Sequence, residues 1–141
     1  MNFLFRLWVY FWVSPVTLLG GLLSFLIILT GGKGSFHSGV WETWGGWPGR
    51  LLESGLPFVG PTAAITLGHV VLGVNEQAMH MSRAHERAHV RQYELWGLWF
   101  LLAYTIASLW AWAKGGHPYR DNPFEVAARR ADKERCQLSV R

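Results

Sequence analysis

The feature that most constrains this chain is an uncharged, apolar segment near its amino terminus, from Leu7 to Thr30. A helix rises about 1.5 Å per residue, so a segment of this length can cross a hydrocarbon core of ~30 Å. Arg6 and Lys33 bracket the segment. Three aromatic side chains lie near its beginning, where membrane proteins place interface anchors: Trp8, Tyr10 and Trp12. The segment therefore predicts a transmembrane helix.

A cleaved signal peptide is the alternative interpretation of an apolar amino terminus. Signal peptides have a shorter apolar region, and an A-x-A-like cleavage site follows it. Here the apolar segment is longer and no such site follows it. We therefore expect an uncleaved membrane anchor over residues 1–33 and a second domain over residues 34–141, which has room for one modest core.

The composition of the chain favours membrane lipid as a partner. Half of the residues are hydrophobic, 15% are aromatic and nine are tryptophan, which is rich for a soluble domain. From Lys114 onward basic side chains outnumber acidic ones, as in segments that bind anionic lipid or nucleic acid. Because acidic side chains are interleaved there, we expect a solvated helix face and no nucleic-acid partner. The single cysteine, Cys136, excludes an internal disulfide and a cysteine-cluster metal site.

Short strands are expected between the anchor and residue 73. Ser38-Gly39 predicts a tight turn between two of them. Residues 47–61 are punctuated by proline and glycine and predict a loop. Thr62 to Gly73 is apolar and β-branched and predicts a strand, in which Gly68 marks a bulge or bend. We expect a small antiparallel sheet of two to four short strands.

The second half of the chain predicts three helices, so the expected fold class is α+β. Asn75 or Ser82 could cap the first helix, which continues without proline or glycine until Gly97. An apolar helix follows over residues 98–113. The last helix is polar, and a cap, a proline and a glutamate mark its first turn: Asn122, Pro123 and Glu125.

The first of these helices carries the stretch "HERAHVRQYE", which begins at His85. Positions i and i+4 lie on one face of a helix, so His85 and His89 could each offer a ring nitrogen to one metal ion. Glu86 beside them could take a proton from a water that the metal makes more acidic. Catalytic zinc generally needs a third protein ligand. The alternative interpretation is an ordinary charged helix face, with Arg83 and Arg87 among its residues.

Together with the later stretch "YRDNPFEVAAR", this motif resembles the zincin metallopeptidase superfamily, and within it the glutamate-zincin branch. The likeness is closer to small, uncharacterised bacterial membrane-anchored proteins with H-E-x-x-H-x-x-Q and N-x-x-E-x-x-A stretches, and it covers about Ala63 to Arg129. The resemblance implies that zinc is held by three ligands and that Glu86 is the general base. The implied ligands are His85, His89 and Glu125. It also implies that an edge strand over residues 65–72 binds substrate backbone.

The role of Glu125 has an alternative, because a glutamate at the third helical position also completes a capping box with Asn122. Other candidates for the third ligand are His69, His80 and His117. His117 or Tyr119 could instead donate a hydrogen bond to a developing oxyanion. Gln92 could hold a histidine ring in place.

Two arginines depart from the pattern of active peptidases. Arg87 occupies a position that is usually uncharged, and Arg91 one that is commonly apolar. Both are expected to make the substrate groove charged, which indicates either an unusual substrate or a site that keeps zinc without cleaving. The enzyme assignment is therefore left uncertain, with a zinc metallopeptidase favoured.

A second apolar run, residues 95–113, is long enough to cross a membrane and has tryptophans at both ends. A crossing there would place His89 and Glu125 on opposite sides of the membrane, so both could not bind one ion. We therefore expect a helical hairpin that folds back after Gly97. Tyr104 and Ser108 then form a polar stripe that packs on another helix.

The sequence as a whole predicts a membrane-anchored zinc-dependent metallopeptidase that cleaves a peptide or protein substrate. We expect it in the bacterial inner membrane, with the amino terminus inside and the metal-site domain outside the cytoplasm. One alternative is a non-catalytic zinc-binding membrane protein, whose zinc closes a small fold. The other is a metal-free protein with two membrane spans. The sequence determines neither the substrate nor the oligomeric state.

Overall fold

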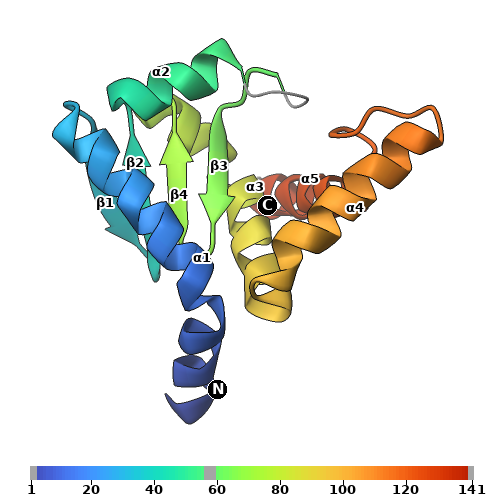
Figure 1. Cartoon of the computed structure of the whole chain (residues 1–141), viewed down its shortest axis with the longest axis horizontal. Coiled ribbons are helices and arrows are strands. Elements are labelled where there is room, and N and C mark those ends of the chain that lie inside the picture. Colours follow the sequence, from blue (N-terminus) through green and yellow to red (C-terminus); the bar gives the residue numbers. More distant parts are fainter. Residues whose placement is uncertain (1–2, 56–59, 140–141) are drawn as a thin grey trace.

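The computed structural model of the chain describes residues 3–55 and 60–139 and confirms the α+β class (Figure 1). Within these residues there are five helices: α1 (Phe3–Leu29), α2 (Gly46–Ser54), α3 (Glu76–Trp96), α4 (Trp99–Ala113) and α5 (Pro123–Ser139). Four strands form one sheet: β1 (Lys33–His37), β2 (Val40–Trp44), β3 (Ala64–Leu67) and β4 (Val70–Gly73).

The sheet is mixed, with the strand order β1-β2-β4-β3. The two outer pairs are antiparallel, but β2 and β4 run parallel, with Trp41 opposite Val70. The expectation of a purely antiparallel sheet was therefore wrong for the central pair. Parallel neighbours need a long connection, and α2 with β3 supplies it here. The turn at Ser38-Gly39 is confirmed: both residues have positive φ, 45° and 84°, as a two-residue hairpin turn of type I′ requires.

Residues 62–73 form a hairpin and not the single strand that was expected. The chain reverses between β3 and β4 at Gly68, whose φ is +63°. A Cβ atom at this position would lie 2.3 Å from Oγ1 of Thr17 in α1. Glycine is therefore required both by the turn and by the close approach of α1.

Residues 46–54 form helix α2, although a loop was expected there. Pro48 lies in the first turn, where a helix has no backbone partner for its amide groups, so the proline does no harm. Leu52 is buried and packs with Ile27 of α1 and Leu72 of β4. Burial of this side chain outweighs the weak local preference of a segment rich in glycine and proline.

Helix α1 lies along one face of the sheet (Figure 1). Its residues Val13 and Val16 belong to the same buried cluster as Tyr93 of α3, and Ile27 to the same cluster as Val70 of β4. The segment Arg6–Leu29 is long and apolar enough to cross a membrane. The division at residue 33 stays a prediction, and the shared core means that it does not separate two packing units.

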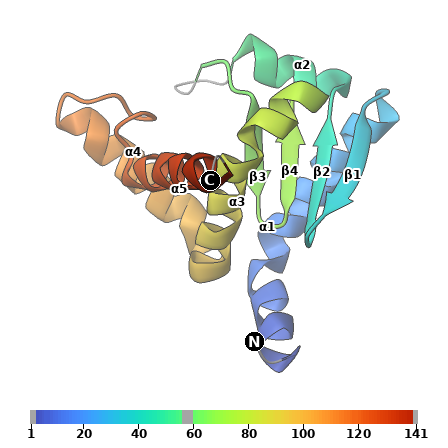
Figure 2. The same ribbon diagram turned by 180° about the vertical axis from the view of Figure 1, so that it is seen from behind.

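Helix α3 covers the opposite face of the sheet. Asn75 caps it by accepting a hydrogen bond from the amide of Ala78 at 2.8 Å, so of the two expected caps this one is used. Met79 and Val90 pack against Val71 of β4. Figure 2, seen from behind, shows α3 in front of the sheet, on the side away from α1.

The chain turns by 115° between α3 and α4, and α5 then returns to pack against α3. The expected fold-back after Gly97 is therefore confirmed. Asn122, which is fully buried, anchors the start of α5 to α4. Its side-chain amide donates to the carbonyl of Tyr104 at 3.1 Å and to Oγ of Ser108 at 2.8 Å, and its oxygen accepts from the amide of Phe124.

Candidate metal centre

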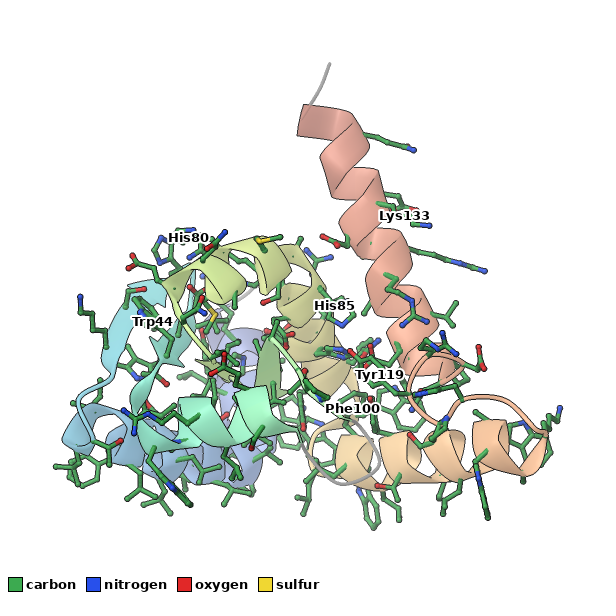
Figure 3. All side chains as sticks on the ribbon, turned by 90° about the horizontal axis from the view of Figure 1, so that it is seen from above. Trp44, His80, His85, Phe100, Tyr119 and Lys133 are labelled. Carbon is green, nitrogen blue, oxygen red and sulfur yellow. The ribbon has the colours of Figure 1, made fainter. Side chains whose placement is uncertain are left out.

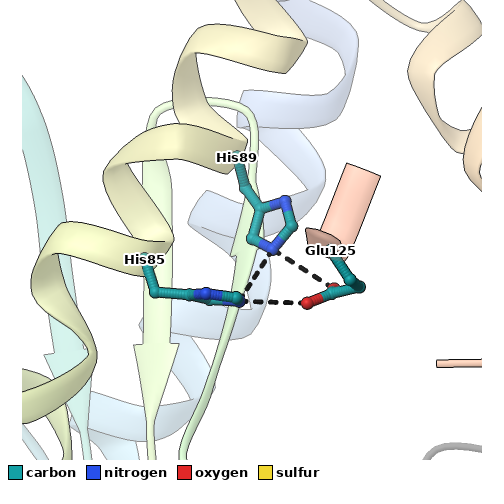
Figure 4. A group of neighbouring side chains, drawn as sticks. All are labelled: His85, His89 and Glu125. Atoms are coloured by element: carbon teal, nitrogen blue, oxygen red, sulfur yellow. Dashed lines mark hydrogen bonds and ion pairs between the residues drawn. The ribbon is translucent and has the colours of Figure 1, made fainter. Parts of the chain in front are cut away.

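Two histidines of α3 and one glutamate of α5 converge on one point (Figure 4). Nε2 of His85 lies 3.1 Å from Nε2 of His89 and 3.1 Å from Oε2 of Glu125. Nε2 of His89 lies 3.3 Å from Oε1 of Glu125. The ligand atoms all lie within 4.8 Å of one another. The group that the sequence singled out can therefore hold a metal ion.

Each member reaches this point because of its place on a helix. His85 and His89 are one turn apart on α3, so their rings project from the same face. Asn122 fixes the first turn of α5 and thereby presents Glu125 to them. In a capping box the side chain of Glu125 would accept a hydrogen bond from the backbone amide of Asn122. That amide donates instead to the carbonyl of Tyr119 at 3.3 Å, so the capping box is not formed. Glu125 is thus directed at the histidines and not at its own helix end.

Gln92 sets the tautomer of His89. Its amide nitrogen donates to the carbonyl of Phe124 at 3.0 Å, so its oxygen faces Nδ1 of His89, at 2.8 Å. Nδ1 must therefore carry the proton, and Nε2 of the neutral ring keeps its lone pair directed into the group of three. A metal-binding histidine needs this arrangement.

Glu125 carries the negative charge of the group. Tyr104 donates its hydroxyl to Oε1 at 2.7 Å. Burial alone would raise the pKa of Glu125, but its contacts with His85 and His89 outweigh burial and lower it. Oε2 is buried and makes no aligned hydrogen bond with any residue in the described ranges. Oε2 lies 3.1 Å from Nε2 of His85 and 3.9 Å from Nη1 of Arg129. A buried carboxylate oxygen without a hydrogen bond, beside an imidazole nitrogen, fits a divalent cation.

Glu86 lies next to the group and is also buried. Its Oε2 accepts a hydrogen bond from Oγ1 of Thr66 on β3 at 2.7 Å. Burial raises the pKa of Glu86, while the charge of His89 and the hydrogen bond from Thr66 reduce the effect. Thr66 was missed by sequence reasoning. The available signal was its place in a short strand just before the motif.

A cavity of about 230 Å³ adjoins the group, between β3, α3 and α4. Most of its wall is apolar, and the residues from β3 and α4 that line it are Ala64, Ile65, Thr66, Leu67, Phe100, Leu101 and Tyr104. Strand β3 is at the edge of the sheet, so its outer backbone borders the cavity. Tyr119 also lines the cavity, and burial raises the pKa of its hydroxyl.

The other histidines considered as ligands do not join the group. Nε2 of His69 lies 3.2 Å from Oε1 of Glu94. The ring of His80 contacts Arg83. Nδ1 of His117 accepts from two backbone amides in its own turn. These partners explain each histidine without a metal.

Arg87 does not enter the groove, so the expectation of a charged groove was wrong for this residue. Its guanidinium lies 3.5 Å from Oε1 of Glu42 and donates to backbone carbonyls of the turn between β1 and β2. Arg83 donates to the same glutamate at 2.8 Å. Arg91 lines a different pocket, beside His69. All three arginines lie on the side of α3 away from His85 and His89.

Comparison of the chain with protein-family models, curated proteins and solved structures found no match. The geometry of the group and of its cavity therefore carries the argument for function.

Proposed function

We propose that the protein is a membrane-associated zinc-dependent metallopeptidase. One observation carries the proposal: His85, His89 and Glu125 converge beside the buried carboxylate of Glu86, at the wall of a cavity bordered by an edge strand. A site built only to close the fold has no use for a cavity or for a fourth, acidic residue beside its ligands.

The donor set supports zinc as the metal. Two imidazole nitrogens and one carboxylate oxygen are the protein ligands of several catalytic zinc sites, in which the remaining position is open to water or substrate. Zinc, when bound, would polarise a substrate carbonyl and make a water molecule acidic enough to lose a proton near neutral pH.

Glu86 is the proposed general base. Its carboxylate accepts a hydrogen bond from Thr66, and its side chain lines the same cavity as His85 and His89. Glu86 therefore borders the space in front of the metal ligands. A pKa raised by burial makes the carboxylate a stronger proton acceptor than an exposed one. The proton taken from water can then pass to the leaving amine of the substrate.

Strand β3 supports a polypeptide as the substrate. An extended peptide can add to an exposed sheet edge through backbone hydrogen bonds. The outer edge of β3 runs along the cavity from Ala64 to Leu67, and Glu86 and His85 line the same cavity. A peptide paired with β3 would therefore pass its backbone carbonyls in front of the metal ligands.

We also propose that the membrane is the bacterial inner membrane. The expected position of the metal centre outside the cytoplasm stays a prediction, because it requires α1 to cross the bilayer. The apolar, membrane-length segment of α1 supports the association with lipid. An epitope placed after Arg141 tests the side of the membrane: in cells with a permeabilised outer envelope and an intact inner membrane, antibody reaches it only if the carboxyl terminus lies outside the cytoplasm.

Glu86→Gln tests the catalytic assignment. The variant keeps the size of the side chain and all three metal ligands, so it should retain about one zinc per chain but lose at least 100-fold in cleavage of a peptide mixture followed by mass spectrometry. His89→Ala should lose both zinc and cleavage. Unchanged cleavage by Glu86→Gln would refute the role of Glu86.

A non-catalytic zinc protein is the second candidate. Its support is that the start of α5 is held beside α3 partly through Glu125. Under this alternative wild type and Glu86→Gln bind zinc alike, neither cleaves peptides, and removal of zinc unfolds the whole chain.

A further inference from the structure

From Val13 to Leu29, helix α1 has two different faces. Before Val13 the helix is exposed on both sides, at Arg6 and Tyr10 as well as at Leu7 and Trp8. One face is buried against the protein, at Val13, Val16, Gly20, Ser24 and Ile27. The opposite face is exposed and wholly apolar, and it comprises Leu4, Leu7, Trp8, Phe11, Pro15, Leu18, Leu19, Leu22, Phe25, Leu26 and Leu29. An exposed apolar stripe of this length marks contact with lipid or with another protein.

Helix α4 repeats this pattern. Its inner face carries Phe100, Tyr104 and Ala111. Its outer face is exposed and uncharged, and comprises Trp99, Leu101, Leu102, Thr105, Ile106, Leu109, Trp110 and Trp112. The only polar side chain there, Thr105, hydrogen bonds to the carbonyl of Leu101 within the helix. We call the exposed faces of α1 and α4 together the apolar face.

Both parts of the apolar face lie on the same side of the molecule. Figure 1 shows α1 and α4 in front of the sheet and of α3 and α5, and Figure 2, seen from behind, shows both helices on the far side. In the view from above, α4 runs along one edge of the molecule, and α5, with Lys133, projects toward the opposite side (Figure 3). Charged side chains of α3 and α5 therefore lie on the far side from the apolar face.

The sheet prevents α1 from crossing a membrane as an isolated helix. The amide of His69 donates to Oγ1 of Thr17, and Nε1 of Trp41 donates to Oγ of Ser24 at 2.7 Å, so strands flank the second half of α1. Strand β1 is a sheet edge and exposes Lys33 and His37. A crossing by α1 would carry this open edge into hydrocarbon, where unpaired backbone groups and charges are not tolerated.

We propose that α1 and α4 lie together in the plane of the bilayer surface and dock the protein on lipid through the apolar face. Tryptophans occur at both ends of α4, as at a membrane interface. Nζ of Lys114 lies 4.5 Å from the ring of Trp110, at the end of the helix, where it can reach lipid phosphates. Helices with one broad apolar face bind membranes in this orientation.

The metal centre opens onto the apolar face. Leu101 belongs both to the exposed face of α4 and to the wall of the cavity that reaches His85 and His89. In Figure 3, Phe100 of α4 lies nearer the apolar face than His85 of α3 does. A second opening, which shares His85 and Glu86 with the first, has three charged residues in its otherwise largely uncharged wall: Arg120, Arg129 and Asp132. The site thus has a lipid-facing mouth and a water-facing mouth.

This arrangement specifies the substrate class, a step that rests on the proposed peptidase function. A chain segment that reaches β3 through the lipid-facing mouth must itself lie in the membrane surface. The substrate is therefore an apolar segment of a membrane polypeptide, and its products leave toward water through the water-facing mouth.

Depth measurements in vesicles test the docking geometry without any need for activity. In the full chain with Cys136→Ser, single cysteines replace Leu7, Leu18 or Leu29 on α1 and Ile106 on α4, and each carries an environment-sensitive fluorophore. The chains are reconstituted into vesicles of phosphatidylcholine with one quarter phosphatidylglycerol. Nitroxide quenchers are attached at a shallow or a deep position of the lipid chain. Matched controls carry the label at Gln77 and Arg130, which are exposed on α3 and α5.

We expect the shallow quencher to reduce the fluorescence of all three α1 labels and of the Ile106 label more than the deep quencher does. The ratio of shallow to deep quenching should be the same for all four labels. The controls should not be quenched. A label that replaces Leu101, at the lipid-facing mouth, should be quenched, and one that replaces Asp132 should not.

A deeper position for Leu18 than for Leu7 and Leu29 would mean that α1 crosses the bilayer, and would overturn the proposal. Unquenched labels at Ile106 or Leu101 would also overturn it, because α4 or the mouth would then face water or protein. Each labelled variant must bind as much zinc as its Cys136→Ser parent, or, if the parent binds none, match its circular dichroism spectrum. A failure of the peptidase assignment alone would leave the quenching pattern unchanged.

Discussion

Two of the three candidate metal ligands, and Glu86 beside them, are each held by a partner outside the group. Gln92 links the ring of His89 to the backbone of α5, Tyr104 holds Glu125, and Thr66 holds Glu86. Such partners fix ring orientation and tautomer before a metal arrives, and their loss commonly lowers metal affinity 10- to 100-fold.

Gln92→Leu should therefore weaken zinc binding by about tenfold or more while the protein stays folded, because Nδ1 of His89 loses its acceptor. Gln92→Glu is the matched control: its carboxylate can still accept from His89, so the loss should be smaller. Competition with a chromophoric chelator measures both affinities. A zinc affinity of Gln92→Leu equal to that of the wild type would contradict the argument that Gln92 sets the tautomer of His89.

Thr66→Val should destabilise the metal-free protein by about 1–3 kcal/mol, because it removes the hydroxyl that hydrogen bonds to the buried carboxylate of Glu86. Thr66→Ser keeps the hydroxyl and should retain most of the stability. Denaturant unfolding in the presence of a chelator measures the free energy of each variant. Equal free energies of unfolding for Thr66→Val and Thr66→Ser would contradict the stabilising role of the hydroxyl.

At the scale of the elements, the helices were easier to predict than the sheet. The repeat of His85 and His89 and the cap at Asn122 are local patterns, so they indicated both helices that hold the metal ligands. The position of Arg87 on the side of α3 opposite His85 was also predictable, because two residues along a helix correspond to a rotation of about 200°. The zinc assignment stays a prediction.

The sheet and α2 depend on contacts between distant segments. The parallel pairing of β2 with β4 follows from how α1 and α3 sandwich the strands, and no local pattern records it. Likewise, burial of Leu52 makes a helix of a segment whose glycines and proline predict a loop. Tertiary packing decided both cases.

Helix α5 is the element whose position depends most on the metal centre. Its first turn is tied to α4 through Asn122, but Glu125 is its charged link to α3. Removal of the metal should therefore increase hydrogen exchange in the first turns of α5, while the amides of β2 and β4 stay protected. Exchange measured by mass spectrometry with and without chelator, and in Glu125→Gln, checks this. Uniform loss of protection in the sheet would instead favour a purely structural metal.

At the scale of the whole molecule, the apolar amino-terminal helix is part of the core and not a detached anchor. It covers one face of the sheet, while α3 covers the other and carries the metal ligands. The proposed lipid-binding face and the candidate metal site therefore belong to one packing unit. A chain of 141 residues can in this way carry both the proposed membrane face and the candidate metal site.

The central claim is that His85, His89 and Glu125 form one metal site, and zinc content tests it most directly. Protein purified in detergent should carry about one zinc per chain, and His89→Ala and Glu125→Ala should each lose it. His80→Ala, which removes an exposed histidine of the same helix, should keep it. A wild-type protein that stays free of zinc after incubation with it, or a Glu125→Ala variant that binds zinc undiminished, would contradict the account.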